Sequence, residues 1–175
     1  MNIMVLIQFY LGEFFASFRL TLSNEGIPTK KGMKLMADNM SKEQRSKTMS
    51  KIRSKSKLED MFASALWRKG IRFRRNVKSL KGTPDIAIVK YKIVIFVDSC
   101  FWHVCPEHFN QPKSNEEYWN KKLKRNVERD AEITAYYLDM GWNIKRIWEH
   151  EIKRDIDQTV DNTIIFIKEI KAKYT

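Results

Sequence analysis

Cysteine and histidine are scarce in this sequence: its 175 residues include only two cysteines and three histidines. Two cysteines permit one disulfide at most, and no other feature indicates an oxidising compartment, so a disulfide-stabilised fold is disfavoured. Acidic residues are also in deficit, with 21 Asp and Glu against 33 Lys and Arg and a net charge of +12. This excess of positive charge indicates a polyanionic partner, nucleic acid before a membrane surface. A merely solvated basic surface is the alternative.

Long uninterrupted apolar runs are missing as well. Residues 1–22 are mostly apolar, but Glu13 and Arg19 interrupt them, and the remaining stretches are too short for a good membrane span. A membrane-tethering helix is the alternative interpretation. We expect residues 1–38 to be an N-terminal extension outside the fold, and residues 39–175 to form one cytoplasmic domain without membrane contact.

The periodicity of the apolar residues predicts an α/β domain with a mixed central β-sheet flanked by helices. The first expected helix begins at a capping-box sequence, Ser41-Lys42-Glu43-Gln44, and is strongly basic. The expected elements are helices over Ser41–Ile52 and Leu58–Lys69, strands over Ile71–Val77, Pro84–Val89 and Ile93–Asp98, a helix over Glu116–Met140, a strand over Trp142–Trp148, and one or two helices over Ile152–Tyr174. The expected apolar face of the long helix is Trp119, Leu123, Val127, Ala131 and Leu138.

The densest chemistry lies in the segment Asp98–His108, directly after an apolar strand. Cys100, Cys105 and His108 have the spacing C-x4-C-x2-H, which suits one tetrahedral zinc ion because zinc accepts thiolate and imidazole alike. A fourth ligand is needed, and His150 is the best remaining candidate. The sequence therefore predicts a structural zinc loop, with two unrelated buried thiols or a disulfide as the alternatives.

Acidic residues on neighbouring strands indicate a second kind of site. Asp85 begins one predicted strand and Asp98 ends the next. Two buried carboxylates are costly unless a cation neutralises them, and Mg²⁺ prefers such ligands together with water and phosphate oxygens. Glu59, in the first turn of a predicted helix, is a further candidate, and a favourable charge at the helix N-terminus is the alternative explanation for it.

Phe101 and Trp102 lie between the predicted zinc ligands, on a segment that we expect to be a loop. One interpretation is that they cover the core, as aromatic residues usually do. The other is that they form a wedge that enters between stacked bases. A zinc ion that ties both ends of the loop would hold such a wedge rigid.

A helix acid, Pro84-Asp85 and an acid on the following strand together resemble the core of restriction-endonuclease-like nucleases, although the usual lysine of that hairpin is missing. The segment Val97–His103, VDSCFWH, resembles the very short patch repair (Vsr) endonucleases more closely. Further matches are Arg45-Ser46-Lys47, Asn126-Val127-Glu128-Arg129-Asp130, Trp142 and Ile147-Trp148-Glu149. The resemblance extends over about residues 40–151.

The resemblance implies a mismatch endonuclease that nicks DNA 5′ of the T in a T:G mispair left by deamination of 5-methylcytosine. Asp85 would be the principal Mg²⁺ ligand, helped by the backbone carbonyl of Val97, and Asp98 would lie next to the metals. His103 would be the general base or a phosphate contact. Glu59 would orient the attacking water or His103.

The resemblance also assigns the remaining positions. Phe101, Trp102 and Trp119 would intercalate. Independently of the resemblance, the position of Lys122 and Asn126 on the polar face of the long helix predicts contacts to bases in a groove. Cys100, Cys105, His108 and His150 would be the zinc shell, with His150 where relatives have cysteine. The expected partners are double-stranded DNA with a T:G mismatch and a mismatch-repair protein, and the protein is expected to be a monomer. Alternatives are a restriction-type DNA endonuclease and a non-catalytic zinc-containing DNA-binding module.

Overall fold

The computed structural model describes residues 43–44, 56–113 and 115–174. The chain divides into two compact units, Met1–Met49 and Ser50–Thr175, and the helices and strands described below belong to the second. Glu43 and Gln44 are helical, as the predicted basic helix requires. The rest of that helix and the predicted extension over residues 1–38 lie outside the described residues.

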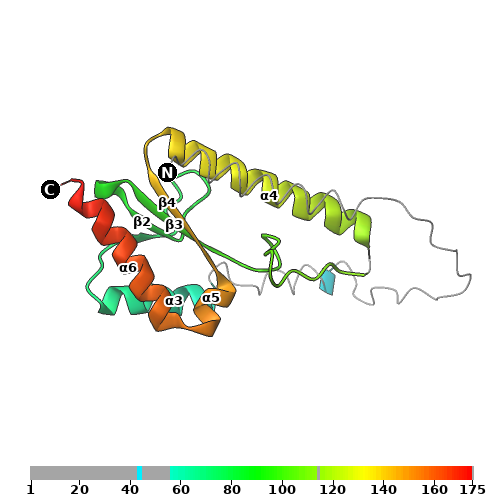
Figure 1. The fold of residues 1–175 in the computed structure, drawn as a ribbon. Helices are drawn as coiled ribbons and strands as arrows, with labels where there is room; N and C mark the ends of the chain where they lie inside the picture. The colour runs from blue at the N-terminus through cyan, green and yellow to red at the C-terminus, as the bar shows by residue number, and fades with distance from the viewer. Residues whose placement is uncertain (1–42, 45–55, 114, 175) are drawn as a thin grey trace, which may run out of the picture. The chain divides into compact units, whose positions relative to one another are not determined.

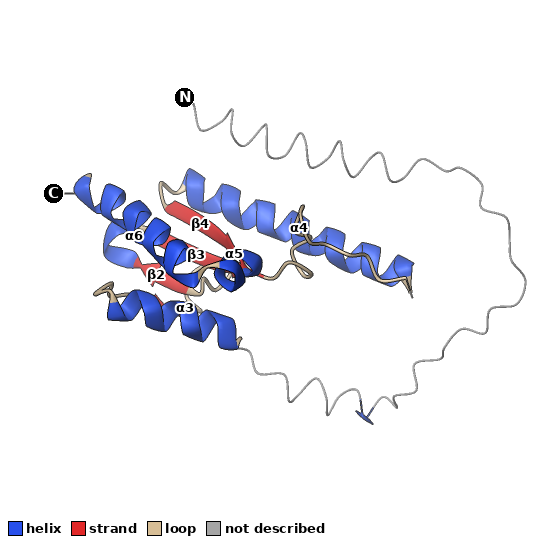
Figure 2. Ribbon diagram, turned by 60° about the horizontal axis from the view of Figure 1, so that its bottom comes forward, coloured by secondary structure: helices blue, strands red, loops and turns tan. Residues whose placement is uncertain are grey.

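The second unit has the predicted α/β fold, with a mixed sheet between helices (Figures 1 and 2). Its elements are α3 (Lys57–Arg68), β1 (Arg74–Arg75), β2 (Ile86–Ile88), η1 (Val89–Tyr91), β3 (Ile93–Asp98), α4 (Glu116–Asp139), β4 (Asn143–Trp148), α5 (Glu149–Arg154) and α6 (Ile156–Ala172). The strand order is β1-β2-β3-β4. The first two pairings are antiparallel and β3–β4 is parallel, so α4 is the crossover between two parallel neighbours. This architecture fits a restriction-endonuclease-like core.

Two hydrophobic clusters cover the two faces of the sheet. The alternation of side chains along β3 sends Ile93 and Ile95 to a cluster with α3, α5 and α6, and sends Val94 and Phe96 to a cluster with Tyr137 of α4. All four of these β3 side chains are buried, as expected for a central strand covered by helices on both faces. Figure 2 shows α4 on one side of the sheet and the other helices opposite.

Helix α3 agrees with its prediction. Ser56 caps its N-terminus by accepting a hydrogen bond from the backbone N–H of Glu59 at 3.1 Å. The buried face consists of Phe62, Ala63, Ala65 and Leu66. Glu59 and Asp60 lie in the first turn of the helix, and Asp60, whose side chain is half exposed, pairs with Arg75 of β1 at 2.6 Å.

Two predicted strands are shorter than expected. The strand predicted over Ile71–Val77 is formed only by Arg74 and Arg75, because Asn76 adopts a φ of 48°, which an extended strand does not tolerate. The strand predicted over Pro84–Val89 is formed by Ile86–Ile88, since the chain turns into the short helix η1 directly afterwards. Asp85 therefore lies just before β2 and not within it.

The buried face of α4 differs from the predicted one. Leu123, Ile133 and Tyr137 are its buried residues, whereas Ala131 is exposed. The prediction followed steps of four residues, and each such step turns 40° too far around a helix of 3.6 residues per turn. The error accumulates along so long a helix, and it hid the fact that Asp130 faces the sheet.

The C-terminal region forms two helices, one of the two arrangements expected for Ile152–Tyr174. The break falls at Asp155, whose side chain caps α6 by accepting a hydrogen bond from the N–H of Gln158 at 2.9 Å. Among the residues that the structure describes, no helix is long and apolar enough to cross a membrane.

Candidate functional site

Asp85 and Val97 meet at the end of the β2–β3 hairpin. The backbone N–H of Val97 donates a hydrogen bond to Oδ2 of Asp85, with an N···O distance of 2.8 Å. In an extended strand the N–H and C=O of one residue leave on the same edge, so the carbonyl of Val97 also faces the Asp85 side. A carboxylate and a backbone carbonyl on one edge form an all-oxygen set of the kind that Mg²⁺ prefers.

The electrostatic surroundings of Asp85 disfavour its negative charge. Burial raises the pKa of Asp85 from 3.8 to about 6, against the lowering effect of the Val97 hydrogen bond. The negative charges of Glu59 and Asp98 raise this pKa further, and only the charge of Arg75 opposes them. The three predicted acids are thus close enough to interact, and a bound divalent cation would relieve their repulsion.

His103 is held by an acid that the sequence prediction did not assign. Its Nδ1 lies 2.5 Å from Oδ2 of Asp130 on α4. Burial opposes ionisation of Asp130, but the hydrogen bond from His103 and the charge of Arg146 outweigh it and lower the pKa of Asp130. An ionised carboxylate only accepts hydrogen bonds, so Nδ1 carries the proton and Nε2 of a neutral His103 is left as the basic atom.

Asp98 is buried and fully engaged by one partner. Only 3% of its surface is exposed, and both its oxygens face Arg146 of β4, at 2.5 Å from Nε and 2.8 Å from Nη2. Burial lowers the pKa of Arg146, but the two carboxylates Asp98 and Asp130 outweigh it and raise this pKa above its ordinary value. Oδ1 of Asp98 also lies 3.7 Å from Nδ1 of His103.

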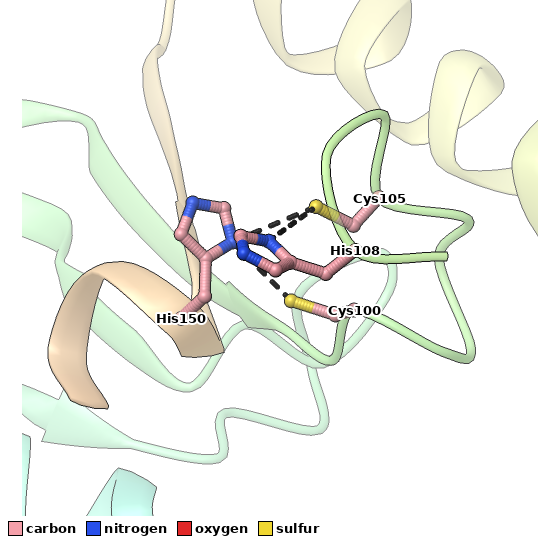
Figure 3. A group of neighbouring side chains, drawn as sticks. All are labelled: Cys100, Cys105, His108 and His150. Atoms are coloured by element: carbon pink, nitrogen blue, oxygen red, sulfur yellow. Dashed lines mark hydrogen bonds between the residues drawn. The ribbon is translucent and has the colours of Figure 1, made fainter. Parts of the chain in front are cut away.

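The four predicted zinc ligands form one cluster (Figure 3). Cys100, Cys105 and His108 come from the loop after β3, and His150 comes from α5, with all four ligand atoms within 4.8 Å of one another. The S···N distances are 3.3 Å for Cys100–His150, 3.5 Å for Cys105–His150 and 3.8 Å for Cys105–His108. In a tetrahedral zinc site, bonds of about 2.3 Å to sulfur and 2.1 Å to nitrogen place S and N about 3.6 Å apart.

The environment of the cluster disfavours a thiolate when no cation is bound. Burial, then the neighbouring Cys105 and Glu149, raise the pKa of the Cys100 thiol to about 11, even though a hydrogen bond with His150 lowers it. A metal ion reverses this balance, because a coordinated thiol loses its proton. The donor set and its spacing therefore fit zinc.

Glu149 fastens the loop to the end of β4. Its Oε1 accepts hydrogen bonds from the backbone N–H of Cys100 at 3.0 Å and from the hydroxyl of Ser99 at 3.4 Å. Burial raises the pKa of Glu149, but Lys153 and these donors outweigh it and hold the pKa below its ordinary value. The carboxylate is thus charged and fixes the start of the CFWH segment next to His150.

The predicted aromatic residues cluster beside this loop. Phe101 packs against Trp102 and Trp119 with ring centroids 5.0 and 5.4 Å away, and the two tryptophans are 5.9 Å apart. Trp102 is 39% exposed, and the ammonium of Lys122 lies 4.8 Å from its centroid. The amide of Asn126 donates to the carbonyl oxygen of Trp102 at 3.0 Å. The expected base-reading residues thus contact the aromatic loop in the free protein.

Three residues of the site were missing from the prediction. Asp130, Arg146 and Glu149 hold His103, Asp98 and the loop, respectively. The sequence pattern contains an indication for Arg146. It lies on the same strand face as Trp142 and Ile144, and a charged residue among apolar ones on a buried face needs a partner. Asp130 and Glu149 belong to the segments Asn126–Asp130 and Ile147–Glu149, which resemble the Vsr family, but the sequence alone predicts no role for either residue.

Comparisons with known proteins identify the family of this chain. A family model described as DNA mismatch endonuclease Vsr matches residues 37–109. The chain is 42% identical over 117 residues to type II nicking enzyme V.NaeI of Lentzea aerocolonigenes, which covers 64% of this chain and 70% of that protein. It is 37% identical over 123 residues to type II nicking enzyme V.HpaIIP of Haemophilus parainfluenzae, covering 67% and 86%. It is also 37% identical over 118 residues to DNA mismatch endonuclease Vsr of Escherichia coli (strain K12), covering 65% and 74%.

Proposed function

This chain belongs to the Vsr family of DNA endonucleases, and we propose that it nicks double-stranded DNA 5′ of the T in T:G mispairs that arise by deamination of 5-methylcytosine. Relatives named as nicking enzymes support cleavage of one strand, and the relative named as a mismatch endonuclease supports the mispaired substrate.

One structural observation carries the proposal: a single short segment bears both the exposed aromatic wedge and the candidate base. Residues 99–103 form a tight turn in which the N–H of His103 donates to the carbonyl of Ser99 at 3.1 Å. Phe101 and Trp102 lie within this turn. A wedge seated between two base pairs would therefore place His103 at a fixed position on the neighbouring backbone.

The aromatic cluster provides a physical basis for mismatch recognition. Opening a base step costs a few kcal/mol, and it costs less where a mispaired base is already poorly stacked. A rigid wedge of Phe101, Trp102 and Trp119 converts that difference into selectivity. Lys122 and Asn126 contact Trp102, and this position supports a role for them in contacting base edges after the wedge has entered.

The acids and His103 are suited to phosphodiester hydrolysis. A water oxygen forms a bond to phosphorus, and Nε2 of His103 takes a proton from this water. The bond between phosphorus and the 3′ oxygen of the preceding nucleotide breaks, and the leaving oxygen takes up a proton from solvent. Asp130 keeps the proton on Nδ1 and orients the ring. Glu59 is assigned to orient the attacking water, since its charge acts on Asp85.

Two metal ions are assigned to the chain. Asp85 and the carbonyl of Val97 would hold Mg²⁺, which supplies Lewis-acid stabilisation of the charge that develops on the phosphate. Cys100, Cys105, His108 and His150 would hold zinc in a structural role. The oxygen donors of the first site and the S···N spacing of the second support these different identities.

We assign the endonuclease domain to residues 39–175, with residues 1–38 outside it. The family match, which begins at residue 37, supports this boundary. We further propose that the domain acts as a monomer on duplex DNA and that a mismatch-repair protein couples the nick to repair synthesis.

The proposal is tested by a nicking assay with Mg²⁺ on end-labelled duplexes that differ only in one T:G or T:A pair, in several flanking contexts. We expect one cut next to the mispaired T, and none in T:A duplexes or in EDTA. Equal cutting of both duplexes would instead establish a restriction-type nuclease. Asp85→Ala should abolish the cut and leave DNA binding intact; tight binding by the parent protein without any cut would indicate a non-catalytic binding module.

A further inference from the structure

We propose that Arg146 is a positioning residue for the nicking reaction: its guanidinium fixes the Asp130 carboxylate that orients His103, and Asp98 serves as the buried counter-ion that holds Arg146 in place. This inference rests on the proposed function, because it assigns the support of the same candidate base. The inference changes the role of Asp98: the resemblance implies that Asp98 lies next to the metal ions, whereas here it holds Arg146.

The guanidinium of Arg146 joins two acids from different elements. Nε and Nη2 bind the two oxygens of Asp98 at 2.5 and 2.8 Å, which is a bidentate pair between β4 and β3. Nη2 also lies 3.0 Å from Oδ1 of Asp130 on α4, and Nη1 donates to the Asp130 backbone carbonyl at 3.4 Å. Arg146 therefore ties the helix to the sheet at the point where His103 is held.

The two oxygens of Asp130 are divided between two partners. Oδ1 faces Arg146 and Oδ2 faces Nδ1 of His103. The contact on Oδ1 fixes the rotation of the carboxylate, so Oδ2 is presented to the imidazole in one orientation. A carboxylate held on one side only could turn about its terminal bond, which has a broad torsional preference.

Arg146 also determines which acid His103 uses. Oδ1 of Asp98 lies 3.7 Å from the same Nδ1 atom, so Asp98 is a competing acceptor for the imidazole proton. Because the guanidinium occupies both oxygens of Asp98, the competing carboxylate is already satisfied. His103 is left with Asp130 as its partner, and the ring takes the orientation set by α4.

The register of the sheet explains why arginine suits this position. Arg146 stands opposite Phe96 in the parallel β3–β4 pair, and its guanidinium lies 5.3 Å from the Phe96 ring centroid. From there it reaches Asp98, two residues further along the same face of β3. Lysine has a single ammonium and cannot provide the planar fork that binds one carboxylate bidentately and a second one alongside.

The test uses four variants: Arg146→Met, Arg146→Lys, Asp98→Asn, and the double variant Asp98→Asn with Arg146→Met. Steady-state nicking at a series of T:G duplex concentrations gives kcat and KM. We expect Arg146→Met to lower kcat roughly 100-fold, at the lower end of what a general base contributes, and to change KM less than about twofold. Arg146→Lys should recover part of kcat. A raised KM with unchanged kcat would overturn the inference, because it would make Arg146 a DNA contact.

The double variant separates positioning from folding. Arg146→Met alone leaves Asp98 buried and unpaired, which can prevent folding, whereas the double variant removes both charges. We expect it to unfold at the same urea concentration as the wild-type protein while kcat stays low, because Asp130 still lacks its guanidinium. Recovery of wild-type kcat in the double variant would overturn the inference, since Arg146 would then serve only to neutralise Asp98.

Asp98→Asn tests the role assigned to that acid. If Asp98 holds Arg146, the variant should need the same Mg²⁺ concentration for half-maximal nicking as the wild-type protein. A several-fold higher Mg²⁺ requirement would overturn the assignment and make Asp98 part of the metal site.

A spectroscopic measurement keeps the inference testable if the parent protein cuts no T:G duplex. The proton on Nδ1 of His103 should give a downfield ¹H NMR signal that disappears in His103→Gln. We expect this signal to move or vanish in Arg146→Met and in the double variant. An unchanged signal in both variants would overturn the positioning role, independently of whether the proposed mismatch activity is found.

Discussion

One oxygen of the Asp85 carboxylate accepts a hydrogen bond from the backbone N–H of Val97 at 2.8 Å, at the end of the hairpin formed by β2 and β3. This hydrogen bond favours the ionised carboxylate, but burial and the charges of Glu59 and Asp98 outweigh it. The result is an acid whose pKa is raised to about 6. The raised pKa therefore affects both the stability of the fold and the binding of a metal ion at Asp85.

Asp85→Asn should stabilise the protein at high pH when no Mg²⁺ is added. Between its ordinary pKa of 3.8 and about 6, the folded protein binds more protons at Asp85 than the unfolded chain does, so stability falls as the pH rises through this window. At pH 8 the variant should be more stable by about 1–3 kcal/mol, from ~1.4 kcal/mol per pKa unit with allowance for partial exposure. Urea denaturation at pH 8 and pH 4 measures the difference. An equal gain at both pH values would contradict the prediction.

The Mg²⁺ requirement for nicking should increase as the pH falls through about 6. A proton and a metal ion compete for the Asp85 carboxylate, and metal binding must release the proton. Below the pKa, the half-activating Mg²⁺ concentration should rise roughly tenfold per pH unit. Single-turnover nicking at a series of Mg²⁺ concentrations measures it at each pH. A requirement that stays constant from pH 7 to pH 5 would show that Asp85 is not the principal ligand.

Cys105→Ser should remove the bound zinc, whereas His150→Cys should retain it. Cys105 is buried and contacts both histidines of the cluster, and a serine hydroxyl in its place leaves the ion with one thiolate instead of two. A cysteine at position 150 still provides a donor that zinc accepts. Zinc content by atomic absorption and the thermal unfolding midpoint are the measurements. Equal loss of zinc from both variants would show that His150 is required as imidazole.

Trp102→Ala should weaken binding to a T:G duplex by about 1–3 kcal/mol, the range for one stacked base, and reduce discrimination against T:A. Trp67→Ala is a matched control, because Trp67 is 49% exposed, as against 39% for Trp102, yet lies outside the aromatic cluster. Fluorescence anisotropy with labelled duplexes gives both affinities. If both variants lose the same affinity, the effect comes from general surface contacts and not from the wedge.

Gly82→Ala should destabilise the fold more than Gly70→Ala does. Both glycines have positive φ, 76° and 86°, so alanine strains the backbone at either position by about 1–2 kcal/mol. A Cβ at Gly82 would also lie 2.7 Å from Cδ1 of buried Ile133, whereas nothing lies within 4 Å at Gly70. Overpacking should add about 1–3 kcal/mol to the first variant. The free energies of unfolding of the two variants in urea measure the difference. If they are equal, α4, which carries Ile133, moves to make room for the methyl group.

Local patterns were sufficient to predict the strand β3, the gathering of Cys100, Cys105 and His108, and the helices on either side of the sheet. The apolar run Ile93–Val97 identifies a buried strand, and the close spacing of Cys100, Cys105 and His108 limits how far apart their ligand atoms can lie. His150 followed by elimination, since only one histidine besides His103 was left. The strand and the loop ligands thus depend on neighbours in the chain, whereas His150 depends on the composition of the whole sequence.

The support of the site could not be predicted in this way, because it depends on tertiary register. Arg146 meets Asp98 only because β3 and β4 pair in parallel with Phe96 opposite Arg146. Asp130 meets His103 only because α4 turns that residue toward the sheet. Neither the pairing of distant strands nor the rotation of a 24-residue helix can be derived from intervals between residues.

The Cys/His cluster also has a consequence for the unfolded chain. Cys100 and His150 are 50 positions apart, and the intervening chain contains α4 and most of the crossover between two parallel strands. An ion that stays bound to both ends closes this segment into a covalent-like ring, as a disulfide would, and restricts the conformations open to the denatured polypeptide. By the chain-entropy relation for cross-links, a ring of this size is worth about 4 kcal/mol. A bound ion can thus cross-link this chain under reducing conditions, in which a disulfide between its two thiols would not persist.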